Sequence, residues 1–160
     1  PAPALLAEEV ELEYQGLTLN GNLEKVESNW PQGPVLLMTH GTLAHNQMEI
    51  MATLQTLFAE RGLSSLAISL SLGLDDREGM YDCATPHRHR HADAIGEIGA
   101  WLNWLKEQGA ERVALLGHSR GGSQTARFAA EYRKLAALTA GGRITRRHQQ
   151  TILSVRDNLA

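Results

Sequence analysis

Residues 117–122 read Gly-His-Ser-Arg-Gly-Gly and match the pattern G-x-S-x-G. They follow an apolar run over 112–117, which predicts a buried strand, and they precede a helix predicted over 121–133. A turn this sharp between a strand and a helix holds the central serine in a strained backbone conformation. Side chains at the flanking positions would collide with neighbouring backbone, so glycine is needed there. We therefore predict an elbow with Ser119 at its tip and Gly117, Gly121 and Gly122 as its close-packed glycines.

Strand-like and helix-like patterns alternate along the rest of the chain. The expected elements are a hairpin over 10–14 and 17–23, buried strands over 35–38, 63–70 and 112–117, helices over 47–59, 94–109 and 121–133, and a short fourth parallel strand over 135–139. Asn46 and Glu49 fit a reciprocal cap at the start of the first helix. Such alternation predicts an α/β fold: a mostly parallel sheet with helices on both faces and an N-terminal antiparallel hairpin.

Composition limits the function classes. The chain has 160 residues, enough for a single domain, which we place at 8–160. Its net charge of -3 provides no basic field for nucleic acid, and no apolar run is long enough to span a membrane. Residues 1–7 resemble the end of a secretory signal peptide, although an arbitrary start or a disordered terminus would look the same. We expect a periplasmic or secreted protein, otherwise a cytoplasmic one, with no cofactor.

A second motif, His40-Gly41-Thr42-Leu43, stands at the end of the first buried strand. Acyl transfer needs two N–H donors for the developing oxyanion, one after the nucleophile and one from the loop after this strand. Arg120 N–H and an N–H near Thr42 or Leu43 meet that need. His40 is expected to brace the loop by hydrogen bonds to backbone rather than to act as a base.

With these motifs in this order, residues 10–139 resemble the α/β-hydrolase superfamily, in particular its small bacterial esterase-like members. The resemblance implies a Ser, Asp or Glu, His triad in that chain order. Downstream of Ser119 the only histidine is His148, the candidate base, and the only aspartate is Asp157, so the acid follows the base. We expect a fragment of a longer protein rather than a short divergent form. Either way, an open sheet edge would offer a site for a protein partner or for a second copy.

The densest ionisable stretch is 87–91, His-Arg-His-Arg-His. Alternate histidines could hold a divalent metal, but two interleaved guanidinium groups repel a cation, so we expect no metal site. Arg88 and Arg90 are expected either in a solvated start of the next helix or in a basic lip that attracts an anionic substrate group, with Asp82 and Asp93 as possible partners. Cys83, the single cysteine, is expected to serve packing.

The sequence thus favours a serine hydrolase that cleaves a small carboxylic ester, thioester or amide through an acyl-enzyme on Ser119. The alternative is a non-catalytic protein of the same fold that binds or assembles with a partner, since the triad is incomplete.

Overall fold

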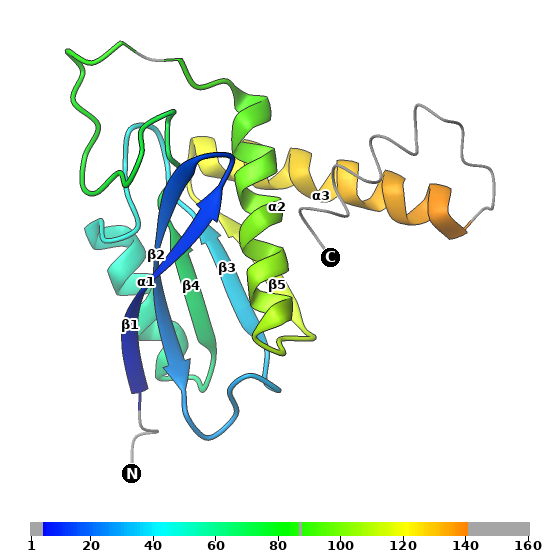
Figure 1. The fold of residues 1–160 in the computed structure, drawn as a ribbon. Coiled ribbons are helices and arrows are strands. Elements are labelled where there is room, and N and C mark those ends of the chain that lie inside the picture. Colours follow the sequence, from blue (N-terminus) through cyan, green and yellow to red (C-terminus); the bar gives the residue numbers. More distant parts are fainter. Residues whose placement is uncertain (1–4, 87, 141–160) are drawn as a thin grey trace.

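The computed structural model describes residues 5–86 and 88–140 as five strands and three helices around one sheet (Figure 1). In chain order the elements are β1 (Leu5–Tyr14), β2 (Leu17–Val26), β3 (Val35–Thr39), α1 (Glu49–Ala59), β4 (Ser64–Ile68), α2 (His91–Glu107), β5 (Val113–Gly117) and α3 (Arg120–Ala140). The predicted α/β class and the N-terminal hairpin are confirmed.

The sheet has the strand order β1-β2-β4-β3-β5. β1 and β2 form the antiparallel hairpin, and β2 also pairs antiparallel with β4. β3 lies at the centre of the parallel part, between β4 and β5. Because β3 and β5 are adjacent and parallel, with Thr39 opposite Gly117, the loops that follow both strands emerge side by side at one edge of the sheet.

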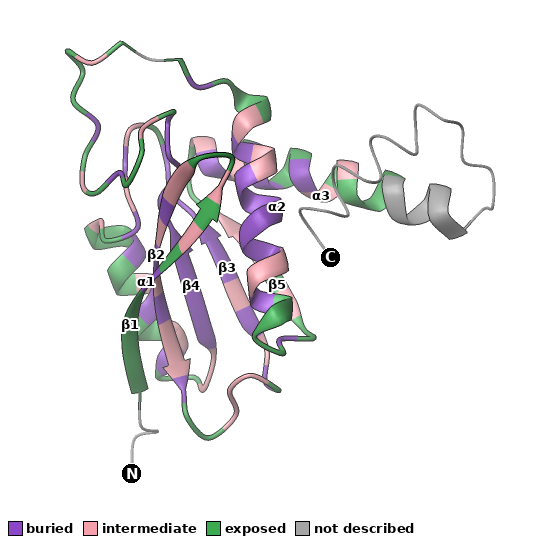
Figure 2. Ribbon diagram, in the orientation of Figure 1, coloured by how far each residue is buried: buried purple, intermediate pink, exposed green. Residues whose placement is uncertain are grey.

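The central strands β3 and β4 are mostly buried (Figure 2), and their apolar side chains pack on both faces of the sheet. On one face, Leu37 and Leu66 pack in the larger core with Ile98 and Trp101 of α2. On the other, Met38 and Ala67 pack against Met51 of α1. β3 and β4 are therefore buried between helices, which fixes their register and holds their carboxyl ends in place. β5, expected as a buried strand over 112–117, contains no buried residue, because it lies at an edge of the sheet.

Three local expectations differ from the structure. Residues 135–139, expected as a strand, continue α3, because Leu and Ala are strong helix formers and no Gly or Pro interrupts the helix before them. α1 begins at Glu49 after Met48 with no side-chain cap, and Asn46 is instead buried with its N–H donated to the Ser69 hydroxyl. β1 begins at Leu5, inside the segment assigned to a leader or a disordered end.

β5 forms the outer strand of the sheet. Within residues 5–86 and 88–140 it pairs only with β3, and it carries no charged residue. Among the helices described, none is long and apolar enough to cross a membrane.

Candidate active site

Ser119 lies in the tight turn between β5 and α3. Its φ of 53° is in the left-handed region, which a residue with a side chain rarely adopts. The turn is closed by hydrogen bonds from His118 N–H to Thr39 O (2.9 Å) and from Gly121 N–H to His118 O (2.9 Å). Ser119 is exposed and immediately precedes the N-terminus of α3, whose partial positive charge favours a developing anion. The predicted elbow is present.

Two glycines make this turn possible because backbone atoms of the neighbouring segment occupy the space of a side chain. A Cβ on Gly117 would lie 2.6 Å from Gly122 Cα and would also collide with Gly121 O. A Cβ on Gly121 would lie 2.5 Å from Thr39 O and would also collide with His40 O. Gly122 is less constrained, since its Cβ would come within 3.3 Å of Gly117 O.

The loop after β3 lies directly against the elbow. A Cβ on Gly41 would approach the Ser119 Cβ to 3.1 Å. Two residues on, Leu43 has a φ of 55°, again in the left-handed region. Leu43 and Arg120 line one small cavity of about 20 Å³, roughly the size of a water molecule. Neither of their backbone N–H groups has an acceptor within the described part of the chain. Two N–H groups thus remain available beside Ser119.

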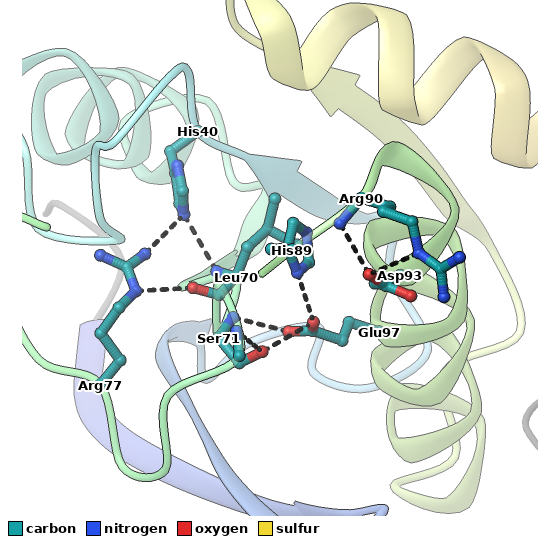
Figure 3. A network of polar contacts seen from close by, with 9 residues as sticks. His40, Leu70, Ser71, Arg77, His89, Arg90, Asp93 and Glu97 are labelled. Atoms are coloured by element: carbon teal, nitrogen blue, oxygen red, sulfur yellow. Dashed lines mark hydrogen bonds and ion pairs between the residues drawn. The ribbon is translucent and has the colours of Figure 1, made fainter. Parts of the chain in front are cut away.

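His40 braces this loop from inside the protein (Figure 3). Its Nδ1 lies 2.7 Å from Gly41 O, and its Nε2 lies 2.9 Å from the Leu70 nitrogen. Nδ1–H therefore donates and Nε2 accepts, so the ring is neutral. Burial, with a further contribution from Arg77, lowers the His40 pKa to about 4. Both ring nitrogens are therefore engaged in hydrogen bonds inside the protein.

Arg77, in the loop between β4 and α2, was not singled out by the sequence. Its guanidinium is buried and donates to Leu70 O (2.7 Å), Gly79 O (2.8 Å) and Ala44 O (2.8 Å), while Nη2 lies 3.2 Å from His40 Nε2. Nothing in the pattern of an irregular segment distinguishes such an arginine from a solvated one. Its role depends on tertiary contacts alone.

Glu97 of α2 is the second residue that the sequence did not identify. It is buried, accepts the Ser71 N–H (2.6 Å) and the Ser71 hydroxyl (2.9 Å), and lies 3.7 Å from His89 Nδ1 (Figure 3). Burial raises the Glu97 pKa to about 7. A signal was present: Glu97 stands between Ala94 and Ile98 on the apolar side of its helix, where a carboxylate needs partners.

The histidine-arginine stretch does not act as one cluster. His89 is buried beside Glu97 and lines the small cavity, whereas His91 is exposed at the start of α2. His87 lies outside the described residues. Among the residues that the structure describes, no group of three His, Cys, Asp or Glu side chains could hold a metal ion.

The two arginines of the expected lip differ. Arg88 lines a cavity of about 460 Å³, together with Tyr14, Phe128 and Tyr132. The Arg90 side chain is 85% exposed and its Nε lies 3.9 Å from Asp93 Oδ2, whereas Asp82 accepts the Ala84 N–H instead of pairing with an arginine. Cys83 is exposed, so the expectation that it serves packing is wrong.

His148 and Asp157, the only downstream His and Asp, lie outside the described residues. The structure therefore brings together Ser119, Gly41, Leu43 and Arg120, with His40 beneath them.

Solved structures of similar fold come from several organisms. Est1E from Butyrivibrio proteoclasticus matches 79% of this chain at 20% identity and a TM-score of 0.63, over 46% of its own length. A dienelactone hydrolase from Anabaena variabilis matches 81% at 23% identity and a TM-score of 0.63, over 59% of its length. An α/β hydrolase, GrgF from a Penicillium species, matches 78% at 25% identity and a TM-score of 0.63, over 42% of its length.

The chain thus spans about half the length of the structures that it matches. No protein-family model matches the sequence, and no curated protein does. The strand order, the elbow between β5 and α3 and the shared architecture of these neighbours lead to one conclusion: this chain has the fold of the α/β-hydrolase superfamily.

Proposed function

We propose that this chain carries the nucleophile and oxyanion half of a serine hydrolase that cleaves small carboxylic esters, thioesters or amides. One observation carries the proposal: Ser119, held at positive φ before α3, lies against Gly41 of the loop after β3, and Leu43 of that loop lines the same cavity as Arg120. Several neighbours of the same fold are described as esterases or as dienelactone hydrolases, which supports this reaction class.

In the proposed reaction, Ser119 Oγ attacks the acyl carbon as its proton passes to a base. The carbonyl electron pair moves onto oxygen, and the N–H groups of Leu43 and Arg120 stabilise the oxyanion. Collapse of this intermediate breaks the bond to the alcohol, thiol or amine, which takes the proton from the base. Water then repeats the sequence on the acyl-enzyme, which releases the acid and restores the serine.

We take His148 as the candidate base, because it follows Ser119 in the chain, as the base does in the superfamily, although Asp157 follows it instead of preceding it. His148→Gln should lower kcat by at least about 100-fold, while His91→Gln, at an exposed site at the start of α2, should not.

A fluorophosphonate probe tests the nucleophile directly. The native protein should be labelled, Ser119→Ala should not, and Ser123→Ala should be labelled like the native protein. Ser123 is the matched control because it is an exposed serine four residues further along the same segment. Labelling that persists in Ser119→Ala, or a folded native protein that is not labelled, would contradict the proposal.

The alternative is a protein of this fold that binds a partner without catalysis. The observation in its favour is β5, an uncharged strand that pairs on one side only within the described residues. Absence of labelling together with concentration-dependent self-association, measured by sedimentation, would favour this alternative over the hydrolase.

A further inference from the structure

We propose that Arg77 is the positioning residue of the oxyanion loop, and that it holds Leu43 in the conformation that directs its N–H toward the substrate. The inference rests on the proposed function for its catalytic consequence. Its structural part, the placement of the loop, can be tested separately.

The oxyanion loop, residues 41–44, needs external support because its conformation is strained. Leu43 has a φ of 55°, in the left-handed region that a residue with a side chain rarely adopts. The loop's own support is limited to a hydrogen bond of 3.3 Å from Ala44 N–H to Gly41 O. Such a conformation persists only where surrounding contacts impose it.

Arg77 contacts both ends of this loop. At its far end, Nη2 donates to Ala44 O at 2.8 Å, directly after Leu43. At its near end, Nη2 lies 3.2 Å from His40 Nε2, and the same His40 ring donates from Nδ1 to Gly41 O. One guanidinium nitrogen thus links Ala44, directly after Leu43, with His40, the residue before the loop.

The other two nitrogens of Arg77 fix the guanidinium in place. Nε donates to Leu70 O at 2.7 Å and Nη1 donates to Gly79 O at 2.8 Å. A planar group that uses three nitrogens on three carbonyls has one orientation, which a lysine cannot reproduce with a single ammonium. The loop after β4 is thereby tied to the loop after β3, and Tyr81 N–H reinforces the link by donating to Leu43 O at 3.2 Å.

The test compares Arg77→Lys with Arg61→Lys in the full chain. Arg61 is the matched control, since it is exposed and donates to a single carbonyl, Leu57 O. With 4-nitrophenyl acetate as substrate, Arg77→Lys should lower kcat by about 10-fold to 100-fold, part of the effect of losing one oxyanion donor, with KM within about threefold. Arg61→Lys should leave both constants unchanged.

Nuclear magnetic resonance supplies a readout that needs no activity. In Arg77→Lys the amide signals of Leu43 and Ala44 should shift or broaden, and the His40 Nε2 signal should move, while amides of β1 stay in place. Unchanged loop amides would overturn the inference. So would shifted amides with an unchanged kcat in an active protein. If the native protein itself hydrolyses no ester, the proposed function fails, and the amides alone decide whether Arg77 places the loop.

If Arg77→Lys does not fold, hydrogen exchange in the native protein tests the inference instead. The Arg77 Nε–H should exchange with solvent far more slowly than that of Arg61, because it is buried and bonded to Leu70 O. Equal exchange rates for the two arginines would overturn the inference.

Discussion

Arg77 and Glu97 bind opposite ends of one peptide unit. Arg77 Nε donates to Leu70 O at 2.7 Å, and the next N–H of the same unit, that of Ser71, donates to Glu97 Oε1 at 2.6 Å. The attraction of Arg77 lowers the Glu97 pKa, but burial has the larger effect and raises it to about 7. At pH 6 the folded protein therefore keeps a proton on Glu97, which an unfolded chain would release.

Glu97→Gln should change how stability depends on pH. In the native protein the folded state binds a proton at Glu97 between pH 4.5 and about 7 that the unfolded state does not, so this group lowers stability as pH rises through that window. Over this window Glu97 lowers the free energy of unfolding by about 3 kcal/mol in total. Urea unfolding from pH 4 to 8 should show that the variant gains stability relative to the native protein as pH rises from 4.5 to about 7. An identical pH profile for both proteins would contradict the Glu97 assignment.

His40→Asn should have the opposite effect on the profile. The unfolded chain protonates this histidine below pH 6.5 and the folded protein only below about 4, so His40 raises stability as pH rises between these values. Its contribution is also about 3 kcal/mol. In the native protein the two groups largely cancel over their shared window. The Glu97→Gln protein should therefore become more stable as pH rises, and His40→Asn should become less stable.

Gly121→Ala should destabilise the protein more than Gly122→Ala. The added methyl group on Gly121 would meet the backbone at Thr39 and His40, and backbone cannot move aside as the end of a flexible side chain can. We expect a loss of about 3 kcal/mol for Gly121→Ala, and about 1 kcal/mol or less for Gly122→Ala, measured by urea unfolding at pH 7. Equal losses would show that the elbow is packed less tightly than the structure indicates.

Arg88→Ala should weaken the turnover of an anionic ester, because Arg88 precedes His89, which lines both the larger cavity and the small cavity at Leu43 and Arg120. Arg90→Ala should have little effect, since that side chain points into solvent beside Asp93. The measurement is kcat/KM for a succinate monoester and for a neutral ester of similar size, at low and high salt. A selective loss of about 3-fold to 10-fold at low salt in Arg88→Ala is expected. Equal losses of kcat/KM for both esters would contradict the expectation that Arg88 attracts an anionic substrate group.

The elbow could be predicted from the sequence because its requirements are local. A glycine whose side-chain position is filled by backbone leaves a signal in the sequence, and Gly117 and Gly121 stand where the strand-to-helix turn needs them. The alternation of apolar strands and amphipathic helices similarly specified the sheet. Local reasoning failed at residues 135–139, which we expected as a strand: their Leu and Ala residues favour a helix, and they continue a helix that has already begun.

The sequence by itself determined the α/β architecture, Ser119 at the strand-to-helix turn and the motif that begins with His40, since each depends on neighbours a few residues away. Only the tertiary structure decided what surrounds them. Arg77 and Glu97 meet at the Leu70–Ser71 peptide from separate parts of the chain, and Cys83 is exposed. The roles of Arg77 and Glu97 depend on burial, because a charged side chain that is removed from water needs hydrogen-bond or charge partners. The tertiary structure supplies these partners from distant parts of the chain.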